Sequence, residues 1–160
     1  MKKVILSISA MLVSVVGFSQ ANVSNVEQYG LLNGALVVQV GSENDSDVFQ
    51  IGAANISVVA QVGDNNESDT NQAGILNIST VFQDGAGNDA YVGQLGIANI
   101  ATTTQLGDSN DAVTGQLGAL NYATTFQLGS DNSATTLQFL FGNQSDTYQE
   151  GEFNDSNVLQ

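Results

Sequence analysis

The sequence contains no cysteine, histidine, tryptophan or proline, and its only basic residues are Lys2 and Lys3. Without cysteine the chain can form no disulfide and offers no thiolate to a metal. The side chains that most often serve as general bases or activated nucleophiles are also missing, so only carboxylates, hydroxyls and Tyr remain for chemistry. Nucleic acid is disfavoured as a partner, because binding it requires Lys or Arg to neutralise phosphate. We expect no cofactor and no metal site.

The first twenty residues differ from everything that follows. Lys2 and Lys3 precede an apolar run over residues 4–18, and small residues follow at Gly17, Ser19 and Ala21. This pattern predicts a secretory signal peptide over residues 1–20, cleaved within about two residues of that point. A short buried segment or a membrane anchor is the alternative, although the run is short for a membrane span. Removal of the signal would leave 16 acidic residues and no basic one.

The rest of the chain is an eleven-residue repeat, Q-x-G-x-x-N-x-[AS]-x-[VT]-x, in unbroken register. The glutamines are Gln28, Gln39, Gln50, Gln61, Gln72, Gln83, Gln94, Gln105, Gln116, Gln127, Gln138, Gln149 and Gln160. The asparagines follow five residues later, at Asn33, Asn44, Asn55, Asn66, Asn77, Asn88, Asn99, Asn110, Asn121, Asn132, Asn143 and Asn154, with Asn22 as an earlier member. Leu140 alone replaces the Gly. A fixed period of this kind predicts stacked repeats.

Each unit predicts one strand and one turn. The repeated positions Ala35, Val37 and Gln39 alternate, and alternate residues of a strand share a face. A β-branched ninth position favours a strand. We expect Gly-x-x-Asn to form the turn, with Gly at positive φ and Asn in the left-handed conformation. This gives thirteen five-residue strands, the first over residues 24–28 and the last over 156–160.

The connections between strands alternate in character, which indicates that the structural period is 22 residues. One series is apolar and covers residues 31–32, 53–54, 75–76, 97–98, 119–120 and 140–141. The other is polar or acidic and covers residues 42–43, 64–65, 86–87, 108–109, 130–131 and 152–153. We therefore predict an all-β fold over residues 22–160: a β-solenoid with two facing parallel sheets and about 6.5 coils, each of two strand-arc units.

Stacking would place the glutamines in two facing columns. An amide side chain carries both donors and an acceptor, so each copy can bond to the copies above and below it, as in cross-β ladders. A single buried and unpaired amide would cost on the order of 1–3 kcal/mol. The perfect phase of the Gln and Asn positions therefore predicts structural ladders rather than a bias towards solubility.

The unit Gln94-x-Gly96-x-x-Asn99-x-Ala101-x-x-x-Gln105 resembles the repeat of the curlin family, the curli fibre subunits of Gram-negative bacteria. The resemblance covers residues 22–160 and is closest to the major subunit. It implies a secreted functional amyloid that polymerises outside the cell for adhesion and biofilm matrix. It also implies export through the periplasm and an outer-membrane pore, with accessory chaperones and a nucleator subunit as partners. Family members often carry Gly directly before the Asn, whereas here only Gly87 and Gly142 occupy that position.

Acidic residues fall mainly on one predicted sheet and on the polar arcs, and none falls on the apolar arcs. We expect four of them to stack in one column and to act as gatekeepers against premature aggregation, namely Asp45, Glu67, Asp89 and Asp111. Assembly should then speed up as the pH falls. Calcium could bridge such carboxylates, but the glycine-rich nonapeptide calcium repeat is absent.

The opposite sheet presents an apolar face whose members include Ile56, Ile78, Ile100 and Tyr122. An exposed apolar surface of this extent favours a role in lateral fibre bundling or surface attachment. The alternative is that these side chains serve only strand propensity. We also expect the two ends of the stack to be open strand edges that a further copy can extend.

Several other functions compete with a fibre subunit. The chain could be a nucleator or minor subunit of the same fibre. A monomeric solenoid could act as an adhesin or bind ice, but the column Leu36, Val58, Thr80, Thr102, Thr124 and Asp146 is too irregular for a repeated Thr-x-Thr face. A carboxylate-based glycosidase is disfavoured, since the acids follow the repeat and no insertion forms a cleft.

Overall fold

The computed structural model describes residues 21–160, which form thirteen β-strands and no helix. The strands are β1 (Val23–Leu31), β2 (Gly34–Ser42), β3 (Asp45–Ala53), β4 (Ile56–Asp64), β5 (Glu67–Ile75), β6 (Ile78–Ala86), β7 (Asp89–Ile97), β8 (Ile100–Asp108), β9 (Asp111–Ala119), β10 (Tyr122–Ser130), β11 (Ser133–Phe141), β12 (Gln144–Glu152) and β13 (Asp155–Leu159). The predicted signal peptide lies outside the described residues. Within them, no helix is long and apolar enough to cross a membrane.

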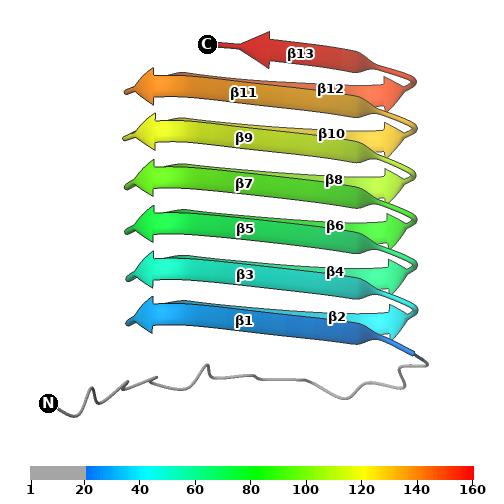
Figure 1. Cartoon of the computed structure of the whole chain (residues 1–160). Coiled ribbons are helices and arrows are strands. Elements are labelled where there is room, and N and C mark those ends of the chain that lie inside the picture. Colours follow the sequence, from blue (N-terminus) through cyan, green and yellow to red (C-terminus); the bar gives the residue numbers. More distant parts are fainter. Residues whose placement is uncertain (1–20) are drawn as a thin grey trace, which may run out of the picture.

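Consecutive strands alternate between two parallel sheets (Figure 1). The odd-numbered strands form a seven-stranded sheet and the even-numbered strands a six-stranded sheet. Each residue pairs with the residue 22 positions further along, as Val59 does with Val81 and Gln61 with Gln83. The predicted all-β solenoid with 22-residue coils is therefore confirmed.

The core lies between the two sheets and is narrow. In β4 the buried residues are Ser57, Val59 and Gln61, whereas Val58 and Ala60 between them are half-buried and the residues on either side, Ile56 and Val62, are exposed. Alternate residues point to opposite faces of a strand, so the constant positions of the repeat face inward and the variable positions face solvent. Most of the large fully buried side chains are glutamines. The amides are therefore part of the core itself.

The turn differs from the sequence prediction in two respects. The strands are mostly nine residues long because the Gly stays within the ladder: Gly63 lies inside β4 with φ of 108°. A Cβ at Gly63 would lie 2.0 Å from the carbonyl oxygen of Gly85, so only Gly lets the coils approach this closely. The left-handed residue is the one before Asn, such as Leu32 with φ of 59°, and not the Asn itself.

Candidate functional site

The Gln side chains form two continuous ladders along the solenoid. In the seven-stranded sheet, Gln50 Nε2 donates to Gln72 Oε1 at 2.6 Å, and in the six-stranded sheet Gln61 Nε2 donates to Gln83 Oε1 at 2.9 Å. The same bond recurs from each Gln to the next Gln of its sheet. All of these bonds point from the N-terminal coil towards the C-terminal coil.

From Gln39 onwards, a second type of bond holds each Gln amide in one orientation. Gln61 Nε2 also donates to two backbone carbonyls, that of Asp45 at 2.8 Å and that of Asn66 at 3.0 Å. A carbonyl oxygen can only accept, so Nε2 must face these groups and Oε1 must face the preceding coil. The bond to Asp45, the first residue of β3, also joins the six-stranded sheet to the seven-stranded one. The sequence predicts the ladder, whereas the bond between the two sheets becomes apparent only in the fold.

The Asn side chains form two further ladders in the arcs. Asn66 donates to Asn44 Oδ1 through its backbone N at 3.1 Å and its Nδ2 at 3.0 Å, and Nδ2 also donates to the carbonyl of Gly85 at 3.0 Å. Each Asn therefore connects three successive coils. The amide-to-amide bonds run from the C-terminal coil towards the N-terminal coil, which is opposite to the Gln ladders. The two ends of the stack are thus distinguished both by the direction of the Gln bonds and by the direction of the Asn bonds.

The acids proposed as gatekeepers stack in the order predicted. Asp45 pairs with Glu67, Glu67 with Asp89 and Asp89 with Asp111 on the outer face of the seven-stranded sheet. Partial desolvation raises the pKa of the Asp89 carboxyl above its usual range, and the charges of Glu67 and Asp111 raise it further. Like charges held in adjacent coils therefore oppose one another.

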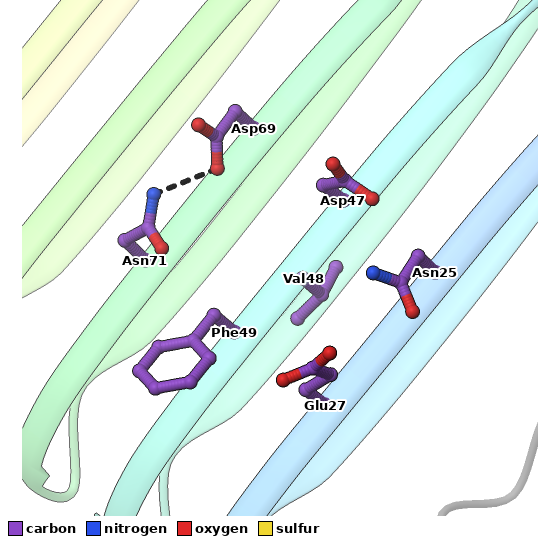
Figure 2. A pocket seen from close by; sticks show the side chains of 7 residues that line it. All are labelled: Asn25, Glu27, Asp47, Val48, Phe49, Asp69 and Asn71. Atoms are coloured by element: carbon purple, nitrogen blue, oxygen red, sulfur yellow. Dashed lines mark hydrogen bonds between the residues drawn. The ribbon is translucent and has the colours of Figure 1, made fainter.

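A hollow of about 300 Å³ lies on the same sheet at its N-terminal end (Figure 2). Its lining residues are Asn25, Glu27, Asp47, Val48, Phe49, Asp69 and Asn71. Desolvation and the charge of Asp47 raise the pKa of Asp69, while a 2.7 Å hydrogen bond from Asn71 Nδ2 opposes the rise. Within residues 21–160 no cluster of three or more acids has an arrangement suited to a metal ion.

Two acids of the polar arcs make contacts that the sequence did not reveal. Asp64 Oδ1 accepts from the backbone N of Ser42 at 3.1 Å and from its hydroxyl at 2.5 Å. Asp108 Oδ1 accepts from the backbone N of Ala86 at 3.0 Å. These carboxylates therefore join adjacent coils in addition to carrying charge. In the sequence, each of these acids follows a small residue by 22 positions, and this spacing could have predicted the contact.

The apolar face lies on the six-stranded sheet, opposite the acidic column. Ile56 pairs with Ile78, Ile78 with Ile100 and Ile100 with Tyr122, so the four side chains form one column. Ile56, Ile78 and Tyr122 are 45%, 36% and 40% exposed. This column begins each even-numbered strand from β4 to β10 and directly follows an apolar arc. The structure thus places the apolar arcs and this column side by side.

Residues 107–139 match the family model of the curlin associated repeat. A search of curated proteins found no match to the chain. The matched segment covers strands β9 and β10 and most of β11, and it has the same register and the same amide bonds as the other coils. Residues 107–139 therefore carry the curlin associated repeat, and this match supports the predicted resemblance to the curlin family.

Proposed function

We propose that this chain is a secreted subunit that polymerises into extracellular curli-like amyloid fibres, which serve adhesion and biofilm matrix. The curlin associated repeat supports the fibre-subunit part of the proposal. The signal-like segment over residues 1–20 supports secretion through the periplasm. By family resemblance, the partners are further copies of the chain, a nucleator subunit, an outer-membrane pore and accessory chaperones.

The observation that carries polymerisation is the uniform direction of the Gln ladders. Within residues 21–160, Gln28 Oε1 and Gln39 Oε1 accept no hydrogen bond, while at the other end Gln149 and Gln160 each direct Nε2 to one backbone carbonyl. A copy added head to tail brings Gln donors to Gln acceptors and continues the ladder. Two N-terminal ends brought together would place Gln acceptors against Gln acceptors, which cannot bond to each other. Elongation should therefore be polar.

The test uses the chain freed of residues 1–20, purified in denaturant and then transferred to buffer. We expect fibres that bind thioflavin and diffract at about 4.7–4.8 Å along the fibre and about 10 Å across it. Fibres seeded at one end should also grow faster from that end. A protein that remains a soluble, globular monomer under these conditions would refute the proposal.

We further propose that the apolar side of the solenoid makes lateral contacts between fibres or with surfaces. Its support is the asymmetry of charge: the apolar arcs carry no acid, whereas the seven-stranded sheet and the polar arcs carry most of them. Acidic faces of neighbouring fibres repel, so contact is directed to the neutral side. A contiguous exposed apolar patch is also typical of an interaction site.

A further inference from the structure

The tip of each apolar arc is a residue in the left-handed conformation. From β1 to β12 these residues are Leu32, Ala54, Leu76, Ala98, Leu120 and Gly142, with φ between 53° and 67°. We call this row the arc-tip row. A bulky side chain at positive φ is an outlier, because its Cβ crowds the following carbonyl. Three Leu residues therefore occupy positions where Gly or Asn would be less strained.

These leucines gain little from the rest of the fold. Leu32, Leu76 and Leu120 are 71%, 53% and 68% exposed. Each therefore combines backbone strain with an apolar side chain that remains in water. Neither property stabilises an isolated solenoid, which indicates that the side chains are used in a contact outside it.

The opposite arcs provide an internal comparison at the same backbone position. There the left-handed residues are Glu43, Asn65, Gly87, Ser109, Asp131 and Phe153, with φ between 54° and 67°. Five of these six are polar or Gly, as expected for a solvated left-handed position. The choice of Leu is thus specific to the apolar arcs and is not a requirement of the turn.

The arc-tip row also alternates strictly between large and small side chains: Leu, Ala, Leu, Ala, Leu, Gly. Successive Leu residues are two coils apart, roughly 10 Å at the usual strand spacing. The Ala or Gly between them leaves a notch about as long as one side chain. The Leu side chains project as knobs and the Ala or Gly positions form holes of similar size. A second copy of the same row therefore fits this surface well.

We propose that a second copy of this chain docks on the apolar arcs, antiparallel to the first, about a two-fold axis between Leu76 and Ala98. Reversing the row converts each Leu position into a small one. Leu32 then meets Gly142, Leu120 meets Ala54, and Leu76 meets Ala98, each pair occurring twice. A parallel copy in register would instead place Leu on Leu. The antiparallel pairing is isologous and closed.

Charge favours the same partner. The row is flanked by the neutral column that begins with Ile56, Ile78 and Ile100 on one side and by Ile51, Leu95 and Leu117 on the other. No acid lies on the apolar arcs, so two copies can approach here without repulsion between their carboxylates. The inference rests on the proposed lateral contact between fibres and specifies its partner and orientation.

The first test replaces Leu32, Leu76 and Leu120 with Gly in the full chain. Gly relieves the strain at positive φ, so the variant should fold at least as well as the parent while losing its knobs. The matched control is Glu43→Gly, Asn65→Gly and Ser109→Gly on the polar arcs, where the backbone position is the same. We expect electron micrographs to show paired fibres for the parent and the control and single fibres for the Leu variant, with equal thioflavin signals. Unchanged pairing of the Leu variant would overturn the inference.

The second test reports the orientation. A chain with Ala54→Cys is mixed with a chain carrying Leu120→Cys, and disulfides are allowed to form. Within one chain these positions are three coils apart, roughly 14 Å, which exceeds the reach of a disulfide. Antiparallel pairing predicts a linked dimer of these two variants. In a second mixture, of Ala54→Cys with Leu76→Cys chains, a linked dimer would indicate a staggered parallel pair and would refute the orientation. The linked dimer can form between soluble copies, so this test can succeed or fail whether or not the chain forms fibres.

Discussion

At the residue scale, an amide in the core is favourable only when it is repeated. A lone buried Gln would leave donors and an acceptor without partners. Here each interior Gln bonds to its copies in both neighbouring coils and to one backbone carbonyl of the facing sheet. The Gln side chain thereby connects adjacent coils to each other and the two sheets to each other. Asn performs the corresponding role in the arcs, where it joins three coils.

We predict that Gln83→Leu strongly destabilises the subunit. Gln61 Nε2 and Gln105 Oε1 would each lose a partner, as would two backbone carbonyls. Gln61 Nε2 keeps the carbonyls of Asp45 and Asn66. The Asn88 carbonyl keeps its bond from the backbone N of Glu67, so Gln105 Oε1 is the buried group left without a donor. At about 1–3 kcal/mol for that group, the loss should be on the order of 2 kcal/mol. The control is Gln144→Leu, whose exposed amide reaches only Asp146, and which should change stability by less than about 0.5 kcal/mol. Denaturant unfolding of dilute subunits measures both, and equal effects would contradict the ladder's role.

Acidification should favour folding and assembly through the column of acids. The folded state raises the pKa of Asp89, so the folded coil binds this proton more readily than the unfolded chain does. Stability contributed by such a group therefore increases as the pH falls through the raised pKa, and it is lost as the pH rises above it. We expect a shorter thioflavin lag at mildly acidic pH than at neutral pH.

The gatekeeper variant for this prediction is Asp89→Asn with Glu67→Gln, which removes the repulsion in two adjacent coils. It should assemble quickly at both pH values. Asp131→Asn, which lies on a polar arc, is a control with the same chemical change. A parent protein whose lag does not depend on pH would show that the column does not gate assembly.

At the scale of the strand and its turn, the Gly of the repeat determines how closely coils approach. At Gly63 a Cβ would collide with a backbone carbonyl of the next coil, and the backbone cannot yield without breaking the ladder. Leu140, which occupies the Gly position in β11, pairs with Gly118 of β9 and is 72% exposed. On its other side no strand of residues 21–160 pairs with it, since β13 ends at Leu159. Its Cβ therefore meets no carbonyl of the described chain.

We predict that Gly63→Ala and Gly34→Ala have opposite effects. Gly63→Ala combines strain at φ of 108° with the 2.0 Å contact, so it should cost about 3 kcal/mol or more. Gly34 has no atom within 4 Å of its would-be Cβ. Its replacement should be neutral or stabilise by about 0.4–1 kcal/mol. Thermal unfolding of the two variants tests this, and similar melting temperatures would disprove the close-approach explanation.

At the scale of the whole molecule, the solenoid has one acidic sheet and one neutral side. The sheets differ because odd and even units diverge in their variable residues while sharing the fixed ones. The fixed residues build the stack and the variable ones distinguish its faces. Net charge keeps separate copies apart everywhere except on the neutral side.

Replacing Ile56, Ile78 and Ile100 together with Ser should weaken lateral contact without preventing fibre growth. These side chains lie in one column beside the apolar arcs and point away from the core. The control is Phe49→Ser with Tyr91→Ser on the seven-stranded sheet, which removes exposed apolar area from the acidic side. Bundle width and binding to an apolar surface are the measurements. If both variants bundle like the parent, the apolar side has no such role.

The sequence alone determined the number of strands, the 22-residue coil, the parallel stacking and the separation of acidic from apolar faces. Each follows from periodicity, because a side chain that recurs every 22 residues must stack on itself once the coil closes. The prediction of which turn residue is left-handed was wrong. The sequence suggested Asn, but the left-handed residue is the one before it, such as Leu32. Periodicity says which residues share a column but not the φ of each one.

Tertiary structure alone decided the direction of the ladders. The sequence shows Gln above Gln, and an amide could bond in either direction. The facing sheet settles the matter, because carbonyls such as that of Asp45 accept only from Nε2 and so turn every Oε1 the other way. Likewise, the strict alternation of Leu and small residues became meaningful only when the fold placed it at exposed, strained arc tips. Both features depend on contacts between coils, which no single repeat contains.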